Sequence, residues 1–580
     1  MIFYTLLFSS ALFLGTTSSP ILRVSEATST TVEPKDAYKA MLNIFVYDAE
    51  GKLLREGIAF YIDAQRNAAT AYSILQGASR AEVVDFKGNR FEVHRILGAN
   101  STFDLVRFST SGSAKVEYLA PVSTPASVGK TALLLNYTTN KKEIFPTVSV
   151  TGDEAYNEFK YYTLSAENEE ANFHRPIVDA VTGELIGITQ KNVSKSATGV
   201  CAIDARFLSA LTISSMSAFN SDLRGILIPK ALPNNPKDAL TYIYMMPTSD
   251  TEASYRAYDD FVQTYPDAPE GYTGRAIYKA AQKNYAGAEA DFALALEKAQ
   301  SPTRPDSLMH PDAVHYQLSD LIYSTVIRQT DTETVFPGWT LERAREEAVK
   351  AYAIEPYTLY KVQEGHCLFA LKNYSEAYAA YAQACRDKEY ASAETFFSAA
   401  RALELSGGDS TEVLTLMDSV IAHVPQPVAA RDAQYYLERS QRLLRAERFR
   451  EAVFDYNEYE KAIGPRNLND KFYYLRSQAE MSARMYQQAL DDIRTAIATA
   501  SEPLPYRLEE AFILLRVGEF DDAITAASNL LKDLPESPDC YKVIGIAYGE
   551  LGKKQEAQEN LQHALRLGDT SVVPFIEKYN

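Results

Sequence analysis

The chain has 580 residues, of which 46% are hydrophobic, and its formal net charge is -18, with 58 Lys and Arg against 76 Asp and Glu. A chain of this length exceeds what one hydrophobic core covers, so two to four domains are expected. The acidic balance argues against nucleic-acid binding, which favours basic surfaces, and against adsorption to anionic membranes. We therefore look for protein or peptide partners.

The first 19 residues have the character of a secretory signal peptide. An apolar run over residues 1–15 is followed by small polar residues at 16–19. The run is too short to span a bilayer, and no second apolar stretch is long enough, so no integral membrane segment is expected in the mature chain. Residues 20–37 are rich in Ser, Thr and Val and are predicted to be a flexible leader. We expect export to the periplasm or the extracellular space.

Short alternating strands are typical of residues 38–213, and four landmarks occur there in a fixed order. They are Gly-Ile-Ala-Phe at 57–60, Thr-Ala-Tyr-Ser-Ile-Leu-Gln-Gly-Ala at 70–78, Phe-Asp-Leu-Val at 103–106, and Ala-Asn-Phe-His-Arg-Pro-Ile-Val at 171–178 with a following strand at 183–188. This order resembles the trypsin-like serine proteases. The resemblance implies two six-stranded β-barrels and a histidine, an aspartate and a serine in three catalytic positions.

Only one of those three positions keeps the residue that the family requires. The histidine position holds Ser73, the aspartate position holds Asp104, and the serine position holds Phe173. A benzyl group cannot attack a carbonyl carbon, so nucleophilic catalysis at Phe173 is chemically excluded. The resemblance therefore implies an inactive protease domain, with Phe173 and His174 projecting into the former active-site cleft.

An alternative is a divergent peptidase with a relocated catalytic set drawn from Ser73, Asp104, His174 and His94. Such a set needs a base within hydrogen-bonding reach of a hydroxyl group, oriented by a carboxylate. The distance from His174 to Ser73 and Asp104 therefore tests this alternative. His94 lies in an alternating strand, where a strand-face position is the simpler interpretation, and Cys201 lies in an apolar strand as a small buried hydrophobe.

No motif in the chain predicts a metal or a cofactor. Four cysteines over this length do not make a disulfide scaffold, and neither Cys-x-x-Cys nor a glycine-rich phosphate loop is present. Cys367 and Cys385 fall on the two helices of one predicted hairpin, so a disulfide between them stays open. We predict no metal and no nucleotide.

From residue 237 to residue 579 the pattern changes to long helical periodicity with recurring Ala and Tyr. One spacing of three, four and three recurs, as in Tyr285-Ala288-Phe292-Ala295, and it appears again in the groups that start at Tyr374, Phe449, Tyr486 and Phe520. This resembles the tetratricopeptide repeat, a helix–turn–helix unit of about 34 residues. We expect about nine helix pairs, a closing helix near residues 570–579, and stacking into a right-handed solenoid with a concave groove.

The groove is expected to be lined by first-helix residues that neighbour the small residue of each repeat. A mixture of apolar, amide and charged groups at these positions suits an extended peptide or a helix. The candidates are Leu437, Gln441, Tyr474, Gln478, Phe512, Lys542 and Ile546. Residues 214–236 are predicted to link the two halves: prolines at 229, 233 and 236 discourage a helix, and the apolar run 225–229 is able to pack against a domain.

Together these features favour an exported, non-enzymatic protein that binds protein or peptide partners through the groove. The protease-like domain then serves as a cap on the solenoid or as a second binding surface. A fixed subunit of a cell-envelope complex is a third interpretation, and it differs from the first in having one permanent partner.

Overall fold

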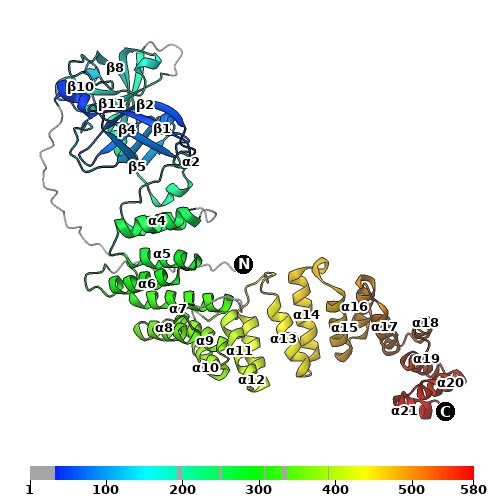
Figure 1. The fold of residues 1–580 in the computed structure, drawn as a ribbon. Coiled ribbons are helices and arrows are strands. Elements are labelled where there is room, and N and C mark those ends of the chain that lie inside the picture. The colour runs from blue at the N-terminus through cyan, green and yellow to red at the C-terminus, as the bar shows by residue number, and fades with distance from the viewer. Residues whose placement is uncertain (1–32, 193–198, 247–250, 306–307, 330–335, 389–390) are drawn as a thin grey trace. The chain divides into compact units, whose positions relative to one another are not determined.

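The computed structural model describes residues 33–192, 199–246, 251–305, 308–329, 336–388 and 391–580 (Figure 1). The predicted signal peptide and most of the predicted leader lie outside these ranges. The chain divides into two compact units, Met1–Pro266 and Asp267–Asn580. The first contains all the strands, and the second is built of helices.

The first six strands close into an antiparallel barrel in the order β1-β2-β3-β6-β5-β4. Apolar side chains alternate with half-buried ones along β1, because successive residues of a strand point to opposite faces. The strands are β1 (Met41–Tyr47), β2 (Leu53–Tyr61), β3 (Asn67–Thr70), β4 (Arg80–Val84), β5 (Arg90–Asn100) and β6 (Leu105–Thr110). Short helices η1 (Pro34–Ala40) and α1 (Tyr72–Leu75) accompany them.

The next six strands form a second closed barrel in the order β10-β11-β12-β9-β8-β7. The strands are β7 (Thr131–Leu134), β8 (Thr147–Tyr156), β9 (Phe159–Glu167), β10 (Pro176–Asp179), β11 (Leu185–Gln190) and β12 (Gly199–Asp204), with η2 (Glu170–Asn172) before β10 and η3 (Ala205–Ala210) after β12. The expected pair of six-stranded barrels is confirmed, in the double-barrel topology of trypsin-like domains.

Strands β10 and β11 are buried on both faces because they belong to two cores at once. Ile177 and Ile186 point into the core of the second barrel. Val178, Leu185 and Ile188 pack instead in a cluster that contains Met41, Phe60 and Leu105 of the first barrel. β10 and β11, whose pairing has an irregularity between Ile177 and Val178, therefore contribute side chains to both cores and join the barrels through a shared apolar layer.

The segment 214–236 packs on the first barrel. It contains η4 (Ser215–Phe219) and α2 (Ser221–Arg224). The amides of Leu227 and Ile228 donate to the carbonyl of Ala78 over 2.8 and 3.0 Å, and Ile226 and Ile228 are buried. The apolar run that interrupts this proline-containing linker is therefore part of the first unit's core.

Two helices beyond the linker also belong to the first unit. They are α3 (Pro236–Tyr244) and α4 (Thr251–Thr264). An ion pair of 2.7 Å joins Arg95 of β5 to Asp260 of α4. The helical pattern thus begins at residue 236, whereas the boundary between the compact units falls 30 residues later.

The second unit is a succession of antiparallel helix pairs, followed in chain order along the colour ramp of Figure 1. The pairs are α5 (Pro269–Ala281) with α6 (Tyr285–Ala299), α7 (Pro311–Arg328) with α8 (Leu341–Ile354), α9 (Thr358–Ala370) with α10 (Tyr374–Ala384), α11 (Ala393–Leu405) with α12 (Ser410–Ala422), α13 (Gln434–Arg445) with α14 (Phe449–Ile463), α15 (Asp470–Ser482) with α16 (Tyr486–Thr499), α17 (Leu504–Val517) with α18 (Phe520–Leu530), and α19 (Pro538–Glu550) with α20 (Lys554–Arg566). Short elements η5 (Pro465–Asn467), η6 (Thr570–Val572) and α21 (Val573–Lys578) complete it.

The turns inside six of these eight pairs share one backbone geometry. A residue with positive φ stands five positions before the small alanine of the second helix, and the next amide bonds back to the carbonyl five residues earlier, which closes the first helix. The positive-φ residues are Lys283, Lys372, Glu447, Arg484, Gly518 and Gly552. Four of them are not glycine, although glycine adopts this conformation without strain. No glycine therefore marks those four turns in the sequence.

Buried arginine–aspartate pairs recur across the two helices of a pair, sixteen residues apart. Arg275 binds Asp291, Arg439 binds Asp455 and Arg476 binds Asp492, each through two hydrogen bonds of 2.6–2.9 Å. Two of these arginines also reach the preceding pair of helices: Arg439 bonds Asp418 over 2.9 Å and Arg476 bonds Glu460 over 2.6 Å. The arginines therefore join neighbouring pairs as well as the helices within a pair.

Replacing Lys372 by glycine should raise the free energy of unfolding of the second unit by about 1 kcal/mol, because the left-handed conformation costs L-residues roughly 1–2 kcal/mol. The matched control is Ala379→Gly, at an exposed site inside α10, which should lower it by about 1 kcal/mol. The measurement is urea unfolding followed by the fluorescence of Trp339, the one tryptophan of the chain, which is buried in this unit. A loss of stability with Lys372→Gly would contradict the strain at this turn.

Candidate functional site

Three loops of the double barrel meet at the carboxylate of Asp104, which lies between β5 and β6. Ser73 comes from α1 of the first barrel, and His174 comes from the loop before β10 of the second barrel. The Ser73 amide and hydroxyl donate to Asp104 over 2.6 and 3.0 Å, and Nε2 of His174 lies 2.8 Å from Oδ2 of Asp104. We call these three residues the Asp104 cluster.

The backbone at both ends of the ion pair is held in a left-handed conformation. Asp104 has φ +46° and His174 has φ +61°. The His174 amide donates to the carbonyl of Thr189 over 2.8 Å, which fixes its loop against β11. Residues other than glycine keep such a conformation only where surrounding contacts impose it, and these positions collect at functional sites.

The electrostatics of the cluster favour an ionised carboxylate. Burial acts to raise the pKa of Asp104, but the hydrogen bonds from His174 and from Ser73 outweigh it. The pKa of Asp104 is therefore below its usual value, and this carboxylate is charged at neutral pH.

The geometry supplies half of a catalytic triad. A carboxylate orients an imidazole, as in the base half of such a site, but the Ser73 hydroxyl donates to the same carboxylate oxygen that His174 contacts. A nucleophile requires its hydroxyl proton to face a base of suitable pKa, and a carboxylate of lowered pKa is a weak one. The relocated catalytic set was to be tested by distance, and His174 lies within hydrogen-bonding reach of Asp104. The Ser73 hydroxyl, however, donates to the carboxylate and not to the imidazole, so the three groups are not connected in the order of a triad.

Phe173 was expected to project its ring into a cleft beside His174. The ring is half-buried and packs against the core of the second barrel, with its centroid 6.4 Å from that of His174. The apolar ring packs on the adjacent core, and His174 is the residue of this loop that turns towards the first barrel.

Arg175 is a structural residue of this loop that sequence reasoning missed. It is 8% exposed, and its guanidinium donates to the carbonyls of Leu135, Leu134 and Ala171 over 2.7, 3.2 and 3.3 Å. Burial lowers the pKa of Arg175. Because the guanidinium binds the ends of two segments, it pins the loop that carries Phe173 and His174 to the chain after β7.

The other nucleophile and base candidates lie elsewhere on the barrels. His94 is exposed on β5. Cys201 is 6% exposed on β12, and burial raises the pKa of its thiol.

The two cysteines for which a disulfide was left open, Cys367 and Cys385 of the helical unit, are free thiols. Burial raises their pKa values to about 12 and about 11.

The groove candidates are spread over the first helices of the last four pairs. Leu437, Tyr474 and Phe512 are half-buried against the helical core, and Gln441 is exposed. Gln478 is half-buried, and its amide nitrogen has no hydrogen-bond partner.

Tyr474 also lines a hollow of about 540 Å³ between α15 and α17. Its ring lies 5.2 Å from that of Tyr506, between centroids. The other lining residues are Lys471, Leu475, Pro505, Leu508 and Glu509. The structure thus gathers apolar, aromatic and charged groups beside one of the predicted groove positions.

The last two groove candidates are covered by the chain's own C-terminal segment. Lys542 donates to the hydroxyl of Ser571 over 2.6 Å and pairs with Asp569 over 3.2 Å. Ile546 packs in a cluster with Val572 and Tyr579. These residues hold the closing helix on the last pair, so the open candidates are those between Leu437 and Phe512.

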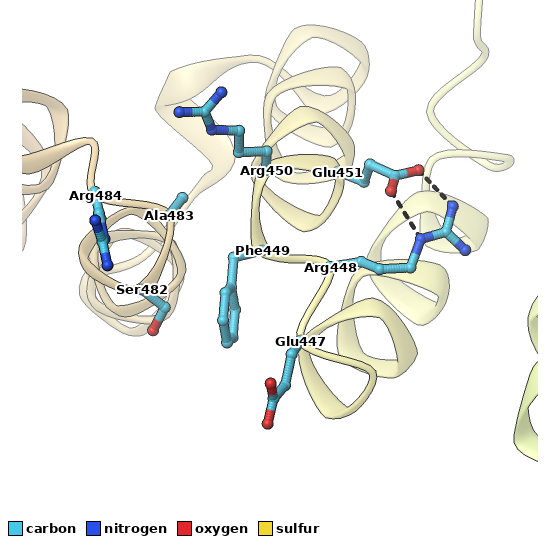
Figure 2. A pocket seen from close by; sticks show the side chains of 8 residues that line it. All are labelled: Glu447, Arg448, Phe449, Arg450, Glu451, Ser482, Ala483 and Arg484. Atoms are coloured by element: carbon cyan, nitrogen blue, oxygen red, sulfur yellow. Dashed lines mark hydrogen bonds and ion pairs between the residues drawn. The ribbon is translucent and has the colours of Figure 1, made fainter.

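A second hollow, of about 360 Å³, lies at the turns of two neighbouring pairs (Figure 2). Figure 2 shows Phe449 pointing into the space between the turns, while the Arg450 side chain extends away from it. Arg448 is engaged by Glu451 through two hydrogen bonds, one of them 2.7 Å long. Arg448 is thus neutralised within its own turn, and Arg450 and Arg484 are the other two arginines that line the hollow.

A scan against models of known protein families finds no match, and a search of curated proteins finds no similar sequence. In the part of the chain that the structure describes, no three His, Cys, Asp or Glu side chains gather in a way that would hold a metal ion. Within the same ranges, no helix combines the length and the apolar character needed to cross a bilayer.

Replacing Asp104 by asparagine should lower the free energy of unfolding of the first unit by about 2 kcal/mol at pH 7, because three donors lose their charged acceptor. The stabilisation is present above the unfolded pKa of an aspartate, near 4, and is lost as the pH falls through the lower folded pKa, so wild type and variant should converge as the pH falls below about 4. The measurement is hydrogen exchange of β6 and β10 in the full chain, comparing proteins at the same pH.

Glu154→Gln, at an exposed site on β8, is the matched control and should leave exchange unchanged. Equal protection of Asp104→Asn and wild type at pH 7 would show that the cluster does not hold the barrels' loops together.

Proposed function

We propose that the protein is a non-catalytic binding protein, in which an inactive trypsin-like domain precedes a tetratricopeptide solenoid that binds protein or peptide partners. The observation that carries the first half is the Asp104 cluster. The Ser73 hydroxyl and the His174 imidazole share one carboxylate oxygen, and the nucleophile position holds a phenylalanine packed on the core.

The tetratricopeptide assignment rests on three features that recur at fixed positions in several helix pairs. These are the three-four-three spacing of the second helices, the left-handed turn five residues before their small alanine, and the arginine–aspartate pair sixteen residues apart. A solenoid of such units presents a long surface of first helices. The hollow beside Tyr474 is the part of this surface best suited to an extended peptide, because it combines apolar walls with Lys471 and Glu509 at its rim.

The second candidate function is a divergent peptidase, and the 2.8 Å contact between His174 and Asp104 is the observation that favours it. In that case His174 acts as a base oriented by Asp104. It would have to deprotonate water or a hydroxyl group that the described cluster does not direct towards it.

The proposal expects no covalent labelling of the purified full-length protein by a fluorophosphonate probe and no cleavage of a mixed peptide library. Phe173 offers no nucleophile, and Ser73 offers one without a suitable base. An active serine peptidase serves as the positive control. Labelling that is lost in Ser73→Ala, or cleavage that is lost in His174→Ala, would establish the peptidase and end the non-catalytic proposal.

Peptides selected from a random library on the full-length protein should bind at least tenfold more weakly to Leu475→Asp, because the carboxylate would be placed in the apolar wall of the hollow. Leu359→Asp is the matched control, since both leucines are 47% exposed on first helices of the same unit. Affinity is measured by fluorescence polarisation with labelled peptides. Equal weakening by both substitutions, or by neither, would remove the hollow as the binding surface.

The proposal includes export, on the basis of the apolar run at residues 1–15 and the small polar residues after it. A periplasmic or extracellular location fits a partner in the cell envelope. That partner either binds transiently or forms a permanent complex with this protein. The net charge of -18 supports protein partners over nucleic acid.

A further inference from the structure

One carboxyl group in the helical unit is buried where neighbouring pairs place an apolar residue. Glu480 of α15 is 4% exposed, and its Oε2 has no hydrogen-bond partner. Its backbone carbonyl accepts the hydrogen bond that closes the helix at the turn. Residues with the same role in other pairs are Leu368, Leu443 and Leu514, which are 1%, 0% and 2% exposed.

A fourth pair shows what a charged residue needs at this position. Lys279 of α5 holds it, and its ammonium lies 2.7 Å from Asp291 of the paired helix. A buried charge is tolerated there because an opposite charge meets it. Glu480 has no such partner in α16, where the corresponding residue is Asp492, a second carboxylate.

Arg476, the cation among the charges that act most strongly on Glu480, is already engaged. Nε and Nη2 of Arg476 donate to Asp492 over 2.6 and 2.9 Å. Its Nη1 donates to Glu460 of α14 and to Asn457 over 2.6 and 2.9 Å. With Asp491 also close, the charges acting on Glu480 are Asp491 and Asp492 from α16, Glu460 from α14, and Arg476 on its own helix.

We propose that Glu480 holds a proton in the folded array, and that losing this proton loosens the packing of α15 on α14 and α16. An ionised Glu480 would be a buried charge beside Asp492 and Glu460, the two carboxylates that already share the Arg476 guanidinium, and close to the charge of Asp491. The neutral acid avoids this penalty. The contact of α15 with α14 and α16 is therefore sensitive to pH, and we call it the pH-sensitive joint.

The direction of the pH dependence follows from the raised pKa of Glu480. Burial, and then the charge of Asp492, raise the pKa of Glu480 to about 8, against an ordinary value of 4.5. Between these two values the folded state holds a proton that the unfolded state releases. Stability is therefore complete at low pH and falls as the pH rises towards 8, by up to about tenfold in the folding equilibrium constant per pH unit.

The joint lies on the helix that also carries Tyr474 and Gln478. Loosening of α15 would move one wall of the hollow that it forms with α17. A partner bound there would therefore be held more tightly at acidic pH, a consequence that rests on the proposed function, whereas the joint itself does not.

The test compares hydrogen exchange of the α15 and α16 amides in full-length wild type, Glu480→Gln and Glu480→Leu, always at the same pH so that intrinsic exchange rates cancel. At pH 8 these amides should exchange at least tenfold more slowly in Glu480→Leu than in wild type. The ratio of the wild-type exchange rate to the variant's exchange rate should fall towards one at pH 5. Glu480→Gln should show the same dependence of the ratio on pH, because it also cannot ionise.

Glu536→Gln, in an exposed loop of the same unit, is the control and should match wild type at both pH values. A wild-type to Glu480→Gln ratio that stays constant between pH 5 and 8 would overturn the proposal, whatever happens to peptide binding. So would faster exchange in Glu480→Leu than in wild type at pH 8.

Discussion

The apolar layer shared by the two barrels is the contact on which the rest of the first unit depends. Because β10 and β11 contribute side chains to both cores, the loop before β10 is brought beside the loop between β5 and β6. This packing allows Ser73 of the first barrel and His174 of the second barrel to contact the same carboxylate, that of Asp104. The hydrogen bonds of the cluster are short, but each is worth far less than the burial that positions them.

The same layer explains why the double-barrel framework does not require particular side chains at the candidate site. Burial of β10 and β11 does not depend on the identity of Ser73 or Phe173. Phe173 adds its ring to the core of the second barrel, and Arg175 ties the loop to backbone carbonyls after β7. The loop is thus held by packing and by a guanidinium.

Much of the architecture was predictable because it rests on local patterns. The order of four landmarks gave a family resemblance that implied two barrels, and the recurring spacing of alanine and aromatic residues led to helix pairs. What the sequence concealed was long-range or conformational. The sequence grouped Ser73, Asp104, His174 and His94 as one candidate set, but it did not fix which of them meet, because the contact of His174 with Asp104 depends on how the two barrels pack. Lysine and glutamate at left-handed turns carry no glycine signal, and the coverage of Lys542 depends on where the C-terminal segment folds. The sixteen-residue arginine–aspartate interval was present in the sequence and becomes meaningful once the pairs are aligned.

The bridges made by Arg439 and Arg476 have a consequence for how the helical unit comes apart. A stack of repeats behaves as a row of elements, each with its own stability and a coupling to its neighbours. Asp418, Arg439 and Asp455 connect α12 to α14 through α13, and Glu460, Arg476 and Asp492 connect α14 to α16 through α15. Arg442 of α13 extends the row to Glu404 of α11, and Arg494 of α16 extends it to Glu510 of α17. These contacts strengthen the coupling in one stretch of the row, so α11 to α17 should melt as a single block. Under mechanical tension, the chain should lengthen in one large step for this block and in smaller steps for the other helices of the unit.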